Sequence, residues 1–269
     1  MTVTVDPHVA LTWIERIAPG TGIERARDEV AVEEPLEIRA DGEAVAVTMR
    51  TPGEDEELAV GFLAGEGLIG GREDVVSAGP TADLEANVVE VRTRAGLRRD
   101  PSDERRFYMT SSCGVCGKAA LEFVHRESPP AAASAPVKPE LVLRLPHEAR
   151  DGQTGFERTG GLHATAVFDP AGEMLVLRED VGRHNAMDKA LGVLLLEGRW
   201  PLTGLLACLS GRAGFELVQK ASVAGLAGVV AVGAPSSLAV ELAEERGTLL
   251  CGFVRGDSFN VYAGAHRLS

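Results

Sequence analysis

The chain has 269 residues, of which 45% are hydrophobic and 25% are charged, and its formal net charge is −13. A chain of this size buries enough apolar surface to fold without metal or disulfide support, and its composition excludes collagen, coiled coil and a wholly disordered chain. The acidic balance argues against nucleic-acid binding, because contact with backbone phosphates needs a basic stripe. A local anion pocket remains compatible with it.

The N-terminal residues Met1–Ala10 lack the basic region and the apolar core of a secretion signal. The longest uncharged run, Ala221–Val240, is interrupted by glycine and proline and predicts no membrane span. We therefore expect a cytoplasmic protein without membrane association. Thiols stay reduced in the cytoplasm, so a close cysteine pair there favours catalysis or metal binding over a structural disulfide.

The first part of the chain predicts a β-rich unit. Residues 28–50 alternate in polarity around an Asp41-Gly42 turn, which indicates a hairpin. A helix is expected from Glu54, because acidic residues fill its first turn. Val88–Val91 predicts another short strand. We assign residues 1–106 to a small N-terminal α+β domain rich in strands.

Residues 107–269 are assigned to a second, α/β domain. Its first part, 107–138, is predicted to be a mobile loop and linker, since Ser128–Lys138 is rich in proline, alanine and serine. Beyond residue 155, strands and helices alternate, which is typical of a sheet covered by helices. Strands are expected at 164–168, 174–178, 205–209, 228–232, 249–254 and 259–262, and helices at 185–197, 215–224 and 237–246.

The sharpest chemical motif is a cysteine pair, Cys113 and Cys116, within the segment CGVCGK. Two thiols at this spacing can form a disulfide, pass a sulfur atom or supply two zinc ligands. Lys118 and a following helix N-terminus would favour the reactive thiolate. A structural zinc site needs four ligands, but Cys208 and Cys251 lie in apolar strand patterns typical of buried cysteines. Structural zinc and dithiol redox chemistry stay open beside sulfur handling.

Polar residues recur at the ends of the predicted strands in the second domain. His163 begins a strand after two glycines, Arg183 follows Gly182 at a strand–helix junction, and Arg212 lies at a second junction of the same kind. Helix N-termini and arginine side chains bind anions, and ligands of α/β sheets lie beyond the strand ends. We predict one pocket for an anionic, nucleotide-like ligand, with Arg255 as a further donor. Each segment alone is also compatible with an ordinary capped turn or a core histidine.

Taken together, these segments resemble the FdhD/NarQ family, the formate dehydrogenase accessory sulfurtransferases. The resemblance covers nearly the whole chain and rests on separated motifs in the same order. These motifs are Glu34-Pro35-Leu36, Thr51-Pro52-Gly53, Glu57-Leu58-Ala59, Gly61-Phe62-Leu63, Glu66-Gly67, Cys113–Lys118, Gly161–Ala164, Glu179–Lys189, Ser210-Gly211-Arg212, Phe215-Glu216 and Arg255. Val115 stands between the cysteines, where the family often has isoleucine.

The resemblance implies that Cys113 carries persulfide sulfur from a cysteine desulfurase, with Cys116 as a second acceptor or resolving thiol. The sulfur would pass to the molybdenum or tungsten bis-molybdopterin guanine dinucleotide cofactor, which is bound as a ligand for insertion into formate dehydrogenase. A homodimer, no permanent metal and a cytidine-deaminase-like layered fold are implied as well. The expected cofactor-binding residues are His163, Arg183, Arg212, Phe253, Val254, Arg255, Gly256, Asp257 and Ser258.

Two alternative functions follow from the same residues. A zinc deaminase pairs an H-x-E motif with P-C-x-x-C, and the glutamate moves the proton. Here Thr165 occupies the glutamate position, Ser112 precedes Cys113 in place of proline, and the order of the motifs is reversed, so deamination is rejected. The alternative from a different class is a non-enzymatic chaperone that binds and shields the cofactor.

Overall fold

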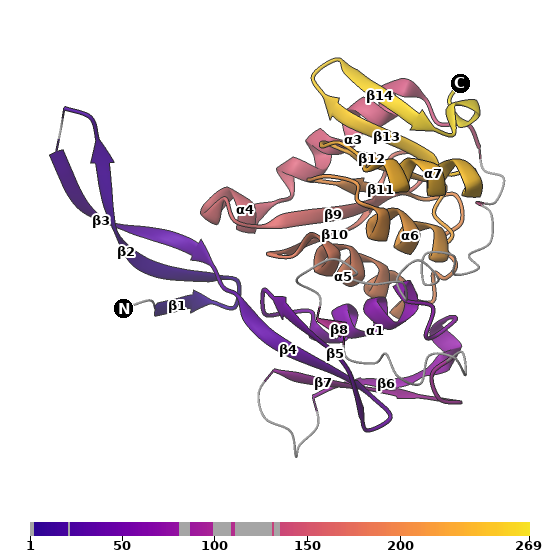
Figure 1. The fold of residues 1–269 in the computed structure, drawn as a ribbon, viewed down its shortest axis with the longest axis horizontal. Coiled ribbons are helices and arrows are strands. Elements are labelled where there is room, and N and C mark those ends of the chain that lie inside the picture. Colours follow the sequence, from indigo (N-terminus) through magenta and orange to yellow (C-terminus); the bar gives the residue numbers. More distant parts are fainter. Residues whose placement is uncertain (1–2, 21, 81–86, 99–108, 111–130, 132–134) are drawn as a thin grey trace.

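The structure is a computed structural model, and it describes residues 3–20, 22–80, 87–98, 109–110, 131 and 135–269. These residues form three sheets and six α-helices. Figure 1 shows a long hairpin on one side, a small lobe at the bottom and a large layered lobe at the top. The α/β prediction is confirmed.

The hairpin arm consists of β2 (Val9–Ala18) and β3 (Gly22–Ala31), and β1 (Val3–Asp6) pairs with the first residues of β2. The arm projects away from the rest of the molecule (Figure 1). At its base, Arg158 of α4 (Thr154–Thr159) makes two hydrogen bonds of 2.8–2.9 Å to the carboxylate of Glu29. Apart from the last residues of β3, the sequence predicts neither strand of the arm, because charged residues interrupt the apolar alternation in both.

The small lobe is built on a five-stranded sheet with the order β6-β7-β4-β5-β8. The predicted hairpin is confirmed. Its turn residues Asp41 and Gly42 have positive φ angles of 51° and 86°, as in the type I′ turns whose twist matches that of the flanking strands. Helix α1 (Asp55–Gly65) begins where acidic residues predict a helix and packs on this sheet. The five strands are β4 (Glu34–Ala40), β5 (Glu43–Arg50), β6 (Val75–Gly79), β7 (Val88–Thr93) and β8 (Met109–Thr110).

The large lobe is a six-stranded sheet with the order β10-β9-β11-β12-β13-β14 and helices on both faces. Its strands and helices confirm each element expected beyond residue 155. The strands are β9 (His163–Phe168), β10 (Met174–Asp180), β11 (Leu206–Leu209), β12 (Gly228–Ala231), β13 (Leu249–Arg255) and β14 (Ser258–Ala263). The helices are α3 (Pro139–Asp151), α5 (Arg183–Leu196), α6 (Phe215–Val223) and α7 (Ser237–Arg246).

Alternate strand residues divide the large lobe into two apolar layers. Helices α5, α6 and α7 pack on one face of the sheet, where Met187 and Leu217 meet Val229. Helix α3 covers the other face, where Leu145 packs among residues such as Phe168. The period of two along a strand produces this division, because neighbouring side chains point to opposite faces.

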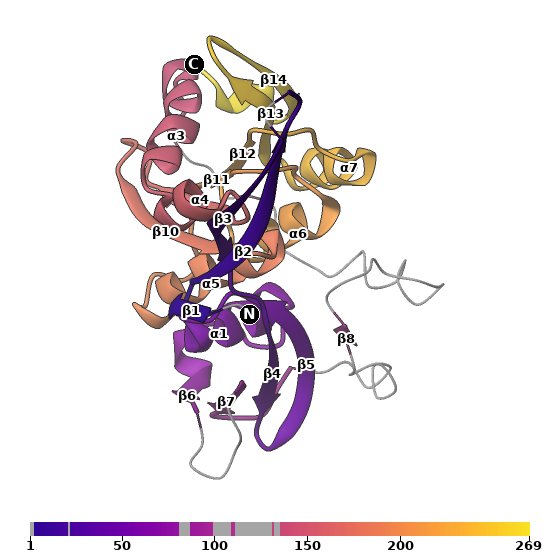
Figure 2. The same cartoon turned by 90° about the vertical axis from the view of Figure 1, so that its left-hand side faces the viewer.

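Helices α1 and α5 join the two lobes and lie side by side (Figures 1 and 2). Two glycines make this contact very close. A Cβ atom on Gly61 would overlap the backbone oxygen of Asp188, and one on Gly192 would overlap that of Glu57. Only glycine therefore allows the two backbones to approach this far.

Other expectations about the chain have mixed outcomes. The division at residue 106 stays a prediction, although β8 adds to the small-lobe sheet from residues beyond it. The linker over 107–138 lies almost entirely outside the described residues. No helix in the described part of the chain is long and apolar enough to cross a membrane.

Candidate functional site

One edge of the six-stranded sheet collects most of the predicted site residues. Strands β11, β12 and β13 run parallel, so their carboxyl ends meet at this edge. Strand β9 runs antiparallel to β11 and begins there with His163, and β10 ends there with Asp180, opposite His163. We call this the carboxyl edge. It is the part of an α/β sheet where ligands commonly bind.

Backbone hydrogen bonds hold the loops of the carboxyl edge together. The Gly233 N–H donates to the Gly211 carbonyl at 2.9 Å, and the Phe253 N–H donates to the Gly233 carbonyl at 3.1 Å. On the β9 side, the Ala164 N–H donates to Ser210 Oγ at 2.8 Å. These bonds connect the loops after β11 and β12 with the end of β13 and the start of β9, so these segments lie next to one another.

His163 lies half-buried at the start of β9, with its ring over Gly211. Burial lowers its pKa, and the positive charge of Arg183 lowers it further. Both effects disfavour the charged imidazolium, so the ring is neutral near pH 7. A neutral imidazole can donate one hydrogen bond and accept another.

Arg183 and His184 form the first turn of α5, whose cap residue Gly182 contributes no side chain. The Nε atom of Arg183 is buried and has no hydrogen-bond partner among the described residues. Nε2 of His184 lies 2.9 Å from the Glu216 carboxylate, and this contact lowers the pKa of Glu216. The unpartnered guanidinium nitrogen at a helix N-terminus is a donor that an anionic ligand can satisfy.

The other predicted ligand residues lie further along the same edge. Arg212 is exposed in the loop after β11, and Arg255 is exposed at the end of β13. Phe253 is 37% exposed and has a φ of 52°, which is a strained conformation for a bulky side chain. The guanidinium of Arg255 lies 5.6 Å from the centre of its ring. Val254 is the exception in this segment, because its side chain is buried in the core.

Cys113 and Cys116 lie outside the described residues. Thr110, the last residue of β8, precedes Cys113 by three positions, and β8 runs parallel to β5. The chain at Thr110 therefore points toward the end of β5, where the Met49 carbonyl accepts a 2.7 Å hydrogen bond from Asn185 of α5. This is the α5 end of the carboxyl edge.

Cys208 and Cys251 are core residues, as their sequence context predicts. Burial raises the pKa of each thiol to about 12, so neither forms a thiolate readily. In the sheet they flank Val230 on neighbouring strands, which separates them by about two strand spacings, roughly 10 Å. Sulfur ligands of one zinc ion lie less than about 5 Å apart, so these two residues cannot share a zinc ion.

The family model for the FdhD/NarQ family matches residues 31–269. The chain belongs to this family. Among curated relatives, the sulfur carrier protein FdhD of Mycolicibacterium paratuberculosis is 51% identical over 264 residues, covering 95% of this chain and 97% of the relative. The protein of the same name from Streptomyces avermitilis is 50% identical over 256 residues, covering 90% and 89%. The resemblance inferred from the separated motifs is confirmed.

The fold of this FdhD/NarQ family member also matches a solved structure. The crystal structure of a protein from Desulfotalea psychrophila, assigned as a formate dehydrogenase accessory protein, superimposes with a TM-score of 0.76. The match covers 98% of this chain and all of that chain at 23% sequence identity. At this identity the likeness establishes the fold, and the site must be argued from the residues.

The motif Glu179–Lys189 contains three buried polar residues behind the carboxyl edge to which the sequence analysis assigns no separate role. Asp180 and Lys189 are both 0% exposed, and Asn185 is 5% exposed. In the sequence they are polar residues at a predicted strand–helix junction, which indicates a functional segment but does not show that these side chains are buried. The available signal was the apolar stretch that follows Lys189, since it predicts that this face of the helix is buried.

Proposed function

We propose that this chain is a sulfurtransferase that accepts persulfide sulfur from a cysteine desulfurase on Cys113. It delivers the sulfur to a molybdenum or tungsten bis-molybdopterin guanine dinucleotide destined for formate dehydrogenase. Membership of a family whose curated relatives are sulfur carriers supports the carrier role. The observation that carries the ligand half of the proposal is the carboxyl edge, where His163 begins β9, Arg183 and Arg212 follow β10 and β11, and Arg255 ends β13.

The length and charge of this edge suit the proposed ligand. From β10 to β13 it spans four strand spacings, about 19 Å, which fits an extended dinucleotide better than a small ion. Arginine side chains bind phosphates through paired hydrogen bonds, and the first turns of α5 and α6 present backbone N–H groups that no side chain caps. Phe253 offers an aromatic face at the far end.

The sulfur transfer itself needs one nucleophilic thiolate at each step. The Cys113 thiolate attacks the terminal sulfur of the desulfurase persulfide, a new S–S bond forms, and the desulfurase cysteine leaves as a thiolate. In delivery this bond breaks with its electron pair going to Cys113, and the acceptor supplies the pair that binds the sulfur. Cys116 is the proposed second acceptor or resolving thiol. A reducing compartment such as the cytoplasm keeps both thiols available.

Mass spectrometry of the intact protein tests the carrier half of the proposal. The wild type and Cys113→Ala are incubated with a cysteine desulfurase and L-cysteine. We expect a reducible adduct of one sulfur atom on the wild type and none on the variant. An adduct retained on Cys113→Ala would refute the assignment of the carrier. No adduct on the wild type, together with intact guanine-nucleotide binding, would favour the cofactor chaperone instead.

Calorimetry with GDP tests the ligand half. Arg212→Gln and Arg255→Gln should each lose a charge-assisted hydrogen bond worth ~1.5–3 kcal/mol, which weakens binding by roughly 10- to 100-fold. Arg144→Gln is the matched control, because Arg144 is an exposed arginine beside the β9–β10 turn at the opposite edge of the sheet. Equal affinity in all variants would place the nucleotide elsewhere.

A further inference from the structure

The carboxyl edge carries two histidines, His163 and His184, which differ in their access to a counter-charge. Nε2 of His184 lies 2.9 Å from the Glu216 carboxylate, so a positive charge on this ring is compensated within the chain. Among the residues that the structure describes, the histidines that take part in ion pairs are His8 and His184, and His163 is not one of them. A charge on His163 therefore has no such carboxylate beside it.

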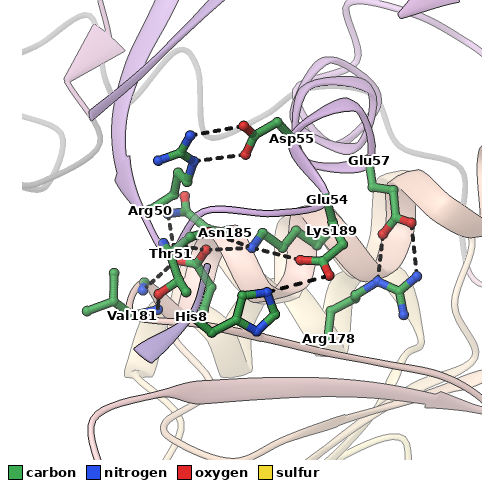
Figure 3. Close-up of polar contacts among 12 residues, drawn as sticks. His8, Arg50, Thr51, Glu54, Asp55, Glu57, Arg178, Val181, Asn185 and Lys189 are labelled. Carbon is green, nitrogen blue, oxygen red and sulfur yellow. Dashed lines mark hydrogen bonds and ion pairs between the residues drawn. The ribbon is translucent and has the colours of Figure 1, made fainter. Parts of the chain in front are cut away.

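Asp180 is the acid that faces His163, because the two residues pair directly in β10 and β9. Its two oxygens accept four hydrogen bonds of 2.8–3.1 Å, from the N–H groups of Thr51 and Gly182 and from the side chains of Asn185 and Lys189. This lysine also donates to the Thr51 carbonyl at 2.9 Å (Figure 3), which fixes its position. An ionised carboxylate has about four acceptor positions, so Asp180 has none left for His163.

The charged groups around His163 keep its ring neutral. Burial lowers its pKa most, and the positive charges of Arg183 and His184 lower it further. The negative charge of Asp180 is the weakest of these influences and the one that acts in the opposite direction. A further anion beside the ring would offset the two positive neighbours and favour the imidazolium.

The ligand of the proposed function would bring such an anion. The buried Nε of Arg183 lacks a hydrogen-bond partner among the described residues, and the His163 ring lies over Gly211, in the loop that also carries Arg212. A phosphate that binds to Arg183 also comes close to His163, since the charge of this arginine acts on the histidine. There it can accept a charge-assisted hydrogen bond from the protonated ring.

We propose that the carboxyl edge binds its anionic ligand together with a proton from the solvent, and that His163 takes up this proton. The proposal rests on the proposed function, because it requires the phosphates of the ligand to lie on this edge. Binding and protonation are then linked in both directions, so the ligand favours the imidazolium and a lower pH tightens binding. His184 takes up less, since Glu216 compensates its charge before the ligand arrives.

The carboxyl groups near the edge must be distinguished from His163 as proton acceptors. The hydrogen bond to His184 lowers the pKa of Glu216, so this carboxylate is ionised near pH 7. Burial raises the pKa of Asp188 to about 6, although Lys220 contacts it at 2.7 and 3.0 Å. An anion nearby favours protonation of a carboxylate as well. A variant that lacks the His163 ring therefore has to identify the acceptor.

Calorimetric titration with GDP in two buffers of different ionisation enthalpy measures the protons taken up on binding. At pH 7 we expect the wild type to take up at least about half a proton per chain with GDP, and close to none with guanosine, which has no phosphates. The second ionisation of a phosphate lies at about pH 6, so GDP itself can only lose protons as it enters a positively charged site. A net uptake therefore comes from the protein.

Three histidine variants locate the proton. His163→Gln should abolish the uptake, and the affinity advantage of the wild type over this variant should shrink by about 5- to 10-fold between pH 6 and pH 8. His184→Gln should retain most of the uptake, whatever its effect on affinity. His147→Gln is the matched control and should bind GDP like the wild type, because His147 is exposed on α3, which covers the other face of the sheet.

The outcomes separate this proposal from the proposed function. GDP binding without proton uptake, or equal uptake with guanosine, would overturn the coupling and leave the ligand site in place. Uptake that persists in His163→Gln would overturn the role of His163 and assign the proton to a buried carboxyl group such as Asp180 or Asp188. A wild type that binds no GDP at any pH overturns the ligand half of the proposed function first. If His163→Gln does not fold, His163→Phe keeps a ring without titratable nitrogens and makes the same test.

Discussion

The hairpin arm and the contact between the two lobes reverse the usual distribution of side chains. At the lobe contact, Lys189 and Asp180 are both 0% exposed and lie among hydrogen-bond partners. On the arm, Ile17 and Ile23 face each other across the two strands and are 69% and 68% exposed. The first region buries charge and the second exposes apolar surface.

The two regions differ in whether contacts within the chain account for the types of residue found there. At the lobe contact, the buried charges of Asp180 and Lys189 are partners of each other, so the fold accounts for their presence there. On the arm, Arg25 and Arg27 cover part of the Trp13 ring at 4.5 and 5.0 Å, yet that side chain stays 46% exposed. Contacts within the chain therefore account for the buried charges at the lobe contact. They do not account for the exposed apolar side chains on the outer arm.

The largest effect is expected from adding a side chain at the close contact between α1 and α5. Gly61→Ala places a methyl group against the backbone of α5, and backbone cannot move away as a flexible side chain can. We expect a loss of about 3 kcal/mol in the free energy of unfolding, measured with urea. Gly65→Ala on the same helix would first meet the Lys220 side chain at 3.1 Å and should cost much less. Similar losses in both variants would contradict the account of the close contact.

A smaller loss is expected from an ion pair at the rim of the lobe contact. Arg178 of β10 makes two hydrogen bonds, of 2.6 and 2.9 Å, to the Glu57 carboxylate of α1 (Figure 3). Arg178→Met should cost about 1–2 kcal/mol, since the pair is partly exposed to solvent. High salt should reduce the difference from the wild type. An unchanged difference in salt would mean that packing of the arginine stem causes the loss.

A partly buried histidine at the carboxyl edge, His163, should make the stability of the fold depend on pH. Its pKa is lower in the folded chain than the unfolded value near 6.5, chiefly through burial. The unfolded chain therefore binds more protons, and stability falls as the pH drops below about 6.5 toward the folded pKa. In His163→Gln this part of the pH dependence should disappear. Parallel curves for the two proteins between pH 5 and 7.5 would refute the shift.

The smallest effect on stability is expected on the arm. Trp13→Ala removes a large side chain that is 46% exposed on a projecting hairpin, so the free energy of unfolding should change by about 0.5 kcal/mol or less. Thermal unfolding of the variant and the wild type measures this directly. A loss as large as that of Gly61→Ala would show that the arm is packed in solution, and the comparison would fail.

Local patterns predicted most of the fold that the structure shows. The Asp41-Gly42 turn and the acidic start of α1 are signals within a few residues, and both are correct. Helix α3 was not predicted, because Pro146 lies inside it and removes a helix hydrogen bond. Packing against the sheet overrides that cost, since Val142 and Leu145 are fully buried, and no local pattern contains that information.

Some residues of the candidate site could also be predicted from local patterns, and others could not. Arg183 and His163 could be selected because strand ends and helix starts are visible in the sequence. The partners of Lys189 could not, because Thr51 precedes it by 138 residues and the two meet only in the folded chain. Long-range polar contacts of this kind depend on how the lobes dock, which a local pattern does not encode.

The glycines between α1 and α5 also bear on how the molecule unfolds. A contact of backbone against backbone leaves no layer of side chains that could loosen first. The two lobes should therefore lose their structure in one cooperative transition, although each has its own sheet. In native-state hydrogen exchange, the central amides of α1 and α5 would then open together with the same free energy, and neither lobe would survive as a partly folded intermediate.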